Sequence, residues 1–269
     1  MEFGDIGTRG LVLVGCGRMG SALLSGWLDR GLAPASVHVQ EPAPSDWLRG
    51  SGVRLNGALP QTPAVVLIAV KPQMMGDALR GLGRLQQGTL VLSVAAGTRI
   101  AAYEAAFGPE AAVVRAMPNT PAAVGRGITA IVGNARAGAD QMALAETLLS
   151  AVGQVVRLET EDQMDAVTAV SGSGPAYVFH MIEALAAAGV SQGLPADLAM
   201  RLARATIVGA GELAHRSQDS AEQLRINVTS PGGTTAAALR ILMDPEAGLT
   251  PLMCRAVQAA ADRGRELGQ

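Results

Sequence analysis

A short apolar run that leads directly into three spaced glycines restricts the fold of this chain more than any other feature. Residues 11–14 are all apolar, as expected for a strand that is covered on both faces. They are followed by the loop 15–20, which reads Gly-Cys-Gly-Arg-Met-Gly, and by an amphipathic segment, 21–30. In such a strand–loop–helix unit, the first glycine permits a tight turn, the second admits a pyrophosphate, and the third allows close helix packing. The sequence thus predicts a dinucleotide-binding loop made of Gly15, Cys16, Gly17, Arg18, Met19 and Gly20.

Further strands alternate with helical segments up to about residue 158. Runs of β-branched and apolar residues predict strands at 37–40, 64–70, 89–94, 113–117, 128–132 and 154–158, with a helix at 140–150. From residue 163 onward the apolar residues recur at helical spacing, and β-branched runs disappear. We therefore expect an α/β Rossmann-type N-terminal domain with a largely parallel sheet at 1–160, and an all-α domain at 161–269.

The second predicted strand ends at Glu41, twenty-one residues beyond Gly20. An acidic residue near this offset typically accepts hydrogen bonds from the adenine-ribose hydroxyls and repels the 2′-phosphate of NADPH. Glu41 therefore favours NADH over NADPH as the cofactor. The alternative interpretation, to which the sequence gives equal weight, is a solvated loop acid before Pro42.

The ends of the next two strands predict the other half of the cofactor site. In a doubly wound sheet the ligand crevice lies beyond the carboxyl ends of the strands. The residues that we expect there are Ala69, Val70, Lys71 and Pro72 after the third strand, and Ala95, Ala96 and Gly97 after the fourth. Lys71 as a general acid is one interpretation, but a cation that positions the cofactor or lies on the surface is the better supported one.

A second Gly-rich stretch, 227–235, reads Asn-Val-Thr-Ser-Pro-Gly-Gly-Thr-Thr and precedes an Ala-rich helical run. Pro231 lacks a backbone donor, while Gly232 and Gly233 admit backbone shapes that other residues avoid. The N–H groups at the start of the following helix favour an anion because the peptide dipoles align there. We interpret the stretch as a pocket for a small carboxylate, with a hydroxyl directed at a neighbouring polar atom. A helix N-cap with ordinary turn chemistry is the alternative.

Composition argues against several other classes of protein. The net charge is −2 and aromatic residues make up 3%. The chain therefore has neither the positive field nor the aromatic stacking surface that nucleic-acid binding uses. Cys16 and Cys254 are the only cysteines and form no cluster with histidine, which argues against a metal site and suits a reducing compartment. The first residues lack a basic segment, and no apolar run reaches about 18 residues, so neither a signal peptide nor a membrane span is expected. We expect a cytoplasmic protein.

Five motifs, in this order, resemble those of the pyrroline-5-carboxylate reductases, which make proline in the last step of its biosynthesis. They are residues 14–20, 69–72, 115–121, 165–177 and 227–233. Ser-Gly-Ser-Gly-Pro-Ala-Tyr at 171–177 and Ser-Pro-Gly-Gly-Thr-Thr at 230–235 are the specific pieces, whereas the nucleotide loop is shared by many families. The resemblance implies NAD(P)H as the hydride donor, a cyclic imine as the substrate, and a helical dimerisation domain that interleaves with a partner's. Such dimers can assemble further, often to decamers.

The same resemblance implies roles for individual residues. Thr235 would meet the ring nitrogen, and the loop before it would hold the substrate carboxylate through backbone N–H groups. The substrate-binding set that it implies is Glu161, Ser230, Gly232, Gly233, Thr234 and Thr235. Asn227 would reach the dinucleotide from the helical domain, and Asn56 fills a cofactor-binding asparagine position if the loop before it is shortened. Many relatives have a serine suited to a 2′-phosphate where this chain has Glu41.

The reaction of this family needs little covalent help from the protein. A protonated cyclic imine accepts hydride readily, so alignment of donor and acceptor about 3–3.5 Å apart is the main requirement. The first rival, a β-hydroxyacid dehydrogenase, needs a catalytic lysine in the helical half, and no lysine occurs from Gln163 onward. The second rival is a non-catalytic nucleotide-binding sensor or scaffold, which the intact loop around Thr235 disfavours.

Overall fold

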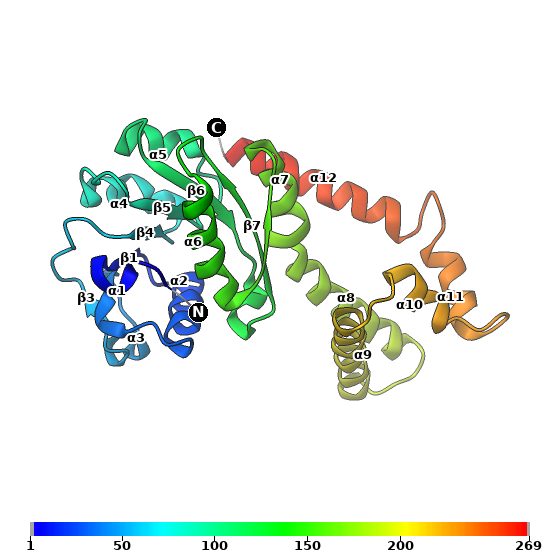
Figure 1. The fold of residues 1–269 in the computed structure, drawn as a ribbon. Helices are drawn as coiled ribbons and strands as arrows, with labels where there is room; N and C mark the ends of the chain where they lie inside the picture. The colour runs from blue at the N-terminus through cyan, green and yellow to red at the C-terminus, as the bar shows by residue number, and fades with distance from the viewer. Residues whose placement is uncertain (1–2, 268–269) are drawn as a thin grey trace. The chain divides into compact units, whose positions relative to one another are not determined.

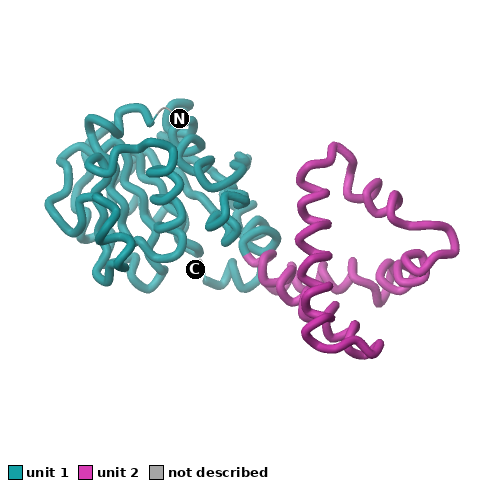
Figure 2. The backbone as a smooth tube through the Cα atoms, turned by 90° about the horizontal axis from the view of Figure 1, so that it is seen from below, with its two compact units in different colours: residues 1–172, 261–269 teal, residues 173–260 magenta. Residues whose placement is uncertain are grey.

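The computed structural model describes residues 3–267. The chain divides into two compact units, the first formed by residues 1–172 with 261–269 and the second by residues 173–260 (Figure 2). No helix within residues 3–267 is both long and apolar enough to cross a membrane.

The first unit is built on an eight-stranded sheet with the order β3-β2-β1-β4-β5-β6-β7-β8 (Figure 1). The strands are β1 (Leu11–Val14), β2 (Val37–Gln40), β3 (Arg54–Leu55), β4 (Val65–Ile68), β5 (Leu90–Ser93), β6 (Ala112–Met117), β7 (Gly127–Gly133) and β8 (Gly153–Arg157). Every neighbouring pair is parallel except β6 and β7, which run antiparallel. The predicted largely parallel Rossmann-type sheet is therefore confirmed, although the two-residue β3 was not expected.

Helices cover both faces of this sheet, because alternate residues of its largely apolar central strands point to opposite sides. Leu11 and Leu13 of β1 belong to one buried cluster, and Val12 and Val14 belong to the other. The helices that contribute to the first cluster are α1 (Ile6–Arg9), α2 (Arg18–Asp29), α3 (Asp46–Gly50) and α6 (Ala139–Leu149). Those that contribute to the second are α4 (Met75–Leu82), α5 (Ile100–Phe107) and α7 (Met164–Val167).

Short turns of helix connect these elements. They are η1 (Pro34–Ser36), η2 (Pro72–Met74), η3 (Thr120–Val124), η4 (Ser150–Val152), η5 (Glu161–Gln163) and the π-helical turn η6 (Thr168–Gly172). The π turn overlaps the start of the Ser-Gly-rich motif at 171–177, and it separates α7 from the first long helix of the second unit.

The second unit is helical, as predicted. Its elements are α8 (Gly174–Ser191), α9 (Ala196–Arg216), α10 (Ala221–Asn227), α11 (Thr234–Leu242) and α12 (Leu249–Leu267), the last of which continues into the first unit. Within residues 173–260 only three alanines and one glycine are buried, namely Ala186, Ala199, Ala203 and Gly248. Many large apolar side chains are exposed instead, among them Phe179, Leu202, Val208, Leu213 and Ile241. A helical unit with so small a core exposes the kind of surface that other proteins use for association.

Candidate active site

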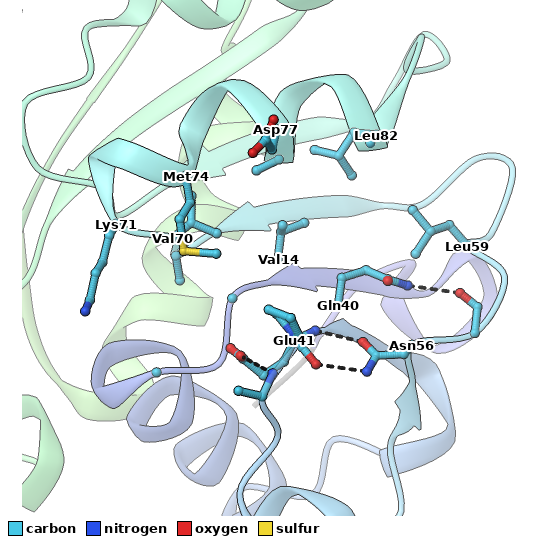
Figure 3. A pocket seen from close by; sticks show the side chains of 18 residues that line it. Val14, Gln40, Glu41, Asn56, Leu59, Val70, Lys71, Met74, Asp77 and Leu82 are labelled. Carbon is cyan, nitrogen blue, oxygen red and sulfur yellow. Dashed lines mark hydrogen bonds between the residues drawn. The ribbon is translucent and has the colours of Figure 1, made fainter.

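A pocket of about 770 Å³ lies at the carboxyl ends of β1, β2 and β4, and α4 forms the opposite wall (Figure 3). In open α/β sheets, ligands bind in the crevice beyond the carboxyl ends of the strands, which is this edge. Seven of the predicted cofactor residues line the pocket, namely Gly15, Gly17, Glu41, Asn56, Ala69, Val70 and Lys71. The structure thus brings together residues from four separate segments of the sequence, namely 15–17, Glu41, Asn56 and 69–71.

The glycine loop has the geometry of a dinucleotide cradle. Gly15 adopts φ 86°, and a Cβ there would lie 2.8 Å from the carbonyl oxygen of Ala69. A Cβ on Gly20 would lie 2.5 Å from the carbonyl oxygen of Gly15, so α2 approaches the loop as closely as its backbone allows. No atom lies within 4 Å of a Cβ on Gly17, which leaves room for a ligand there.

The start of α2 supplies the donors of this cradle. Gly17 is the N-cap of the helix, and the first backbone bond of the turn runs from Ser21 N to the Gly17 carbonyl, at 2.9 Å. The N–H groups of Arg18, Met19 and Gly20 precede that bond, so they have no acceptor within the helix. A pyrophosphate fits this site, because such donors and the helix dipole both favour an anion.

Glu41 lies half-buried across the mouth of the glycine loop. Its Oε2 accepts a hydrogen bond from Cys16 N at 2.7 Å, and its Oε1 accepts one from Ala43 N at 3.0 Å. Both carboxylate oxygens keep lone pairs for a further donor, such as a ribose hydroxyl. The pKa of the Cys16 thiol is raised, mainly by burial, so this residue remains a thiol and fills space in the loop.

The walls of the pocket differ in character. Leu59, Met74, Ala78 and Leu82 supply an apolar surface of the kind that accepts a flat aromatic ring. Glu41 and Asp77 contribute negative charge, and Lys71 is the only cation among the described residues that line the pocket. The Lys71 side chain is exposed.

The other predicted cofactor residues lie outside the lining of this pocket. Cys16, Arg18, Met19 and Gly20 belong to the loop and to the start of α2, and Pro72 begins the turn η2. Ala95, Ala96 and Gly97 follow β5, and a Cβ on Gly97 (φ 77°) would lie 3.4 Å from the carbonyl oxygen of Leu267. Asn227 is the last residue of α10, in the second unit, where its Oδ1 accepts a hydrogen bond from Gln223 at 2.8 Å.

Glu161 is held by a buried arginine that sequence reasoning did not single out. Arg115 lies on β6 and is 3% exposed, and its Nη1 donates to Glu161 Oε1 at 2.8 Å. The same oxygen accepts a hydrogen bond from Ile100 N at 2.8 Å. The Arg115 Nε has no hydrogen-bond partner in the described part of the chain. The available signal was an arginine in the middle of an apolar strand, because a buried charge is rarely found without a partner.

We expect Arg115→Met to destabilise the protein by about 1.5–3 kcal/mol, the range for a hydrogen bond to a charged group. The Glu161 side chain is only 18% exposed and would keep the Ile100 N–H and the more exposed Arg99, whose Nε lies 3.8 Å from Glu161 Oε2. Urea unfolding of the Arg115→Met, Glu161→Gln and double variants measures the coupling between the two side chains. If the losses of unfolding free energy in the two single variants simply add in the double variant, the proposed pairing is contradicted.

The second Gly-rich stretch forms the start of α11, within the second unit. Gly232 adopts φ 70°, Gly233 is the N-cap, and the first helical bond runs from Ala237 N to the Gly233 carbonyl at 3.1 Å. The N–H groups of Thr234 and Thr235 therefore precede the first helical bond. Within residues 3–267 the hydroxyls of these two threonines make no hydrogen bond, whereas the Thr229 hydroxyl donates to the Arg225 carbonyl.

Comparison with known proteins extends these observations to the whole chain. Residues 161–267 match the family model for pyrroline-5-carboxylate reductase dimerisation, and residues 10–97 match the model for NADP oxidoreductase, coenzyme F420-dependent. A pyrroline-5-carboxylate reductase of Synechocystis sp. is 42% identical over 266 residues, which cover 96% of this chain and 98% of the relative.

Solved structures show the same relationship. The pyrroline-5-carboxylate reductase of Coxiella burnetii matches with a TM-score of 0.89 at 34% identity, covering 97% of this chain and 99% of the other. The Plasmodium falciparum pyrroline carboxylate reductase with NADP bound matches with a TM-score of 0.82 at 29% identity, covering 98% and 99%. These likenesses extend over both units of the fold. The chain belongs to the pyrroline-5-carboxylate reductase family.

Proposed function

We propose that this chain reduces 1-pyrroline-5-carboxylate to L-proline, the last step of proline biosynthesis, with a nicotinamide dinucleotide as the hydride donor. The observation that carries the proposal is the pocket at the glycine loop, in a chain 42% identical over nearly its whole length to a reductase of this name. The bound dinucleotide supplies the hydride, and the protein supplies alignment and electrostatics.

The cofactor-binding residues are the glycine loop, Glu41, Asn56, the segments 69–72 and 95–97, and Asn227. The Glu41 carboxylate favours NADH, because the 2′-phosphate of NADPH would bring a second negative charge close to it. Two unit charges about 4 Å apart repel by about 1 kcal/mol in water and about 4 kcal/mol near a protein surface. Lys71 is the only described cation of the lining that could offset this repulsion.

The substrate-binding residues are those of the loop 230–235 together with Glu161. The backbone N–H groups at the start of α11 hold the substrate carboxylate, as an anion at a helix N-terminus is held. The Thr235 hydroxyl, which has no partner within residues 3–267, orients the ring nitrogen and passes it a proton from water. Glu161 is fixed by Arg115 and the Ile100 N–H, and so presents a pre-oriented carboxylate to the substrate.

The working assembly is a dimer in which the helical domains interleave, and such dimers assemble further into decamers. The exposed apolar side chains of residues 173–260 support this, because the unit buries so little of its own surface. We assign substrate binding and dimerisation to residues 161–269 and the dinucleotide to residues 1–160.

The direct test is an assay of the pure protein with pyrroline-5-carboxylate and either NADH or NADPH. We expect proline to form with both nucleotides, with kcat/KM at least about tenfold higher for NADH, the ratio equivalent to about 1.4 kcal/mol. Absence of nucleotide oxidation with either would favour a non-catalytic sensor. A clear preference for NADPH would refute the role given to Glu41 while leaving the reaction itself intact.

A further inference from the structure

Asn56 has an unusual backbone for its position. It follows β3 on an exposed loop and adopts φ 52°, and it is the only non-glycine residue within residues 3–267 with a positive φ. Asparagine tolerates the left-handed region better than most residues, but the conformation still carries a cost. Because the residue is exposed, core packing does not offset the free-energy cost of this backbone conformation.

The Asn56 side chain is occupied with the main chain of Glu41. Its Oδ1 accepts a hydrogen bond from Glu41 N at 2.9 Å, and its Nδ2 donates to the Glu41 carbonyl oxygen at 2.9 Å (Figure 3). The Asn56 N–H donates to the Val39 carbonyl at 2.8 Å, which ties the loop to the end of β2. The left-handed turn thus directs a carboxamide at the backbone of one particular residue.

Glu41 is consequently fixed from both sides. Asn56 holds its main chain, while Cys16 N and Ala43 N hold its carboxylate. Without the two bonds from Asn56, the end of β2 could rotate and move the carboxylate off the glycine loop. A displaced carboxylate would neither accept hydrogen bonds from ribose hydroxyls nor repel a 2′-phosphate at the same place.

We propose that Asn56 is a positioning residue that sets the preference between NADH and NADPH by clamping Glu41 at the glycine loop. The inference rests on the proposed use of a nicotinamide dinucleotide, but not on turnover of the imine. It goes beyond the cofactor-binding role proposed above for Asn56, because the effect of Asn56 on the preference between NADH and NADPH passes through Glu41.

The test compares the Kd values of NADH and NADPH, measured by fluorescence titration without substrate. Asn56→Gly is the informative variant, because glycine accepts φ 52° freely and removes only the carboxamide. We expect the ratio of the two Kd values to move at least about fivefold towards NADPH, through weaker NADH binding and tighter NADPH binding together. An unchanged ratio, or both Kd values changed by the same factor, would overturn the proposal.

Two further variants separate positioning from general loosening of the loop. Ser45→Ala removes the N-cap bond of α3, from Leu48 N to Ser45 Oγ at 3.2 Å. Ser45 lies four residues after Glu41, in the loop between β2 and α3, and its substitution is expected to leave the ratio of the two Kd values unchanged. In a Glu41→Gln background, Asn56→Gly is expected to have no additional effect on the ratio, since the charge that it positions is gone. Additive effects in that background would show a direct contact instead. Failure to bind either nucleotide would overturn both this inference and the proposed function.

Discussion

Gly20→Ala is expected to abolish dinucleotide binding and to destabilise the first unit, whereas Gly17→Ala is expected to spare the fold and weaken only the nucleotide. The added methyl at Gly20 would lie 2.5 Å from the carbonyl oxygen of Gly15. That carbonyl cannot retreat easily, because Gly15 N is bonded to the Gln40 carbonyl at 2.9 Å and the turn already lies against Ala69. Overpacking of this kind typically costs about 1–3 kcal/mol and shifts the backbone.

Gly17 differs because a Cβ there meets nothing within 4 Å and its φ is −69°. Alanine is a poorer N-cap than glycine, so a loss of about 1 kcal/mol or less is expected in stability. The methyl would occupy the space that a pyrophosphate approaches, and we expect the Kd for NADH to rise at least about tenfold. Thermal unfolding and NADH titration of both variants check this, and equal thermal stability of the two would contradict the packing argument.

Much of the fold could be predicted because it depends on local patterns. The wholly apolar strands, the glycine loop and the change to helical spacing after residue 163 each reflect burial or backbone geometry within a few residues. The reversed direction of β7 was not predicted, since strand direction depends on how the chain turns through η3 rather than on composition. The helix α10 was missed although Ser220 and Gln223 have the spacing of a capping box, and the Ser220 hydroxyl does accept from Gln223 N at 3.1 Å.

The contacts that organise the candidate site were harder to foresee. Asn56 and Glu41 are 15 residues apart, and Arg115 and Glu161 are 46 apart, so only the folded sheet brings each pair together. The division at residue 160 stays a prediction. In the structure, Met164 is buried in the second cluster of the sheet, and the compact first unit extends to residue 172.

Thr235→Ala is expected to lower kcat by about 10²-fold or more while changing the Kd for NADH by less than about twofold. Loss of one oriented hydrogen bond or proton donor at a reacting atom costs this much in many enzymes. The substitution keeps the backbone N–H groups at the start of α11, so the substrate carboxylate retains its donors. KM for pyrroline-5-carboxylate is therefore expected to change less than kcat.

Two neighbouring substitutions make this result specific to one hydroxyl. Thr235→Ser keeps an O–H donor and is expected to restore most of the turnover, whereas Thr234→Ala is expected to change turnover little because Thr234 acts through its backbone. Both threonine hydroxyls lack partners within residues 3–267, but Thr235 is half-buried and Thr234 is exposed. Steady-state kinetics with NADH and pyrroline-5-carboxylate measure all three variants. Equal losses of kcat in Thr234→Ala and Thr235→Ala would assign the effect to the helix start as a whole. Loss of NADH binding in Thr235→Ala would show that this residue belongs to the cofactor site instead.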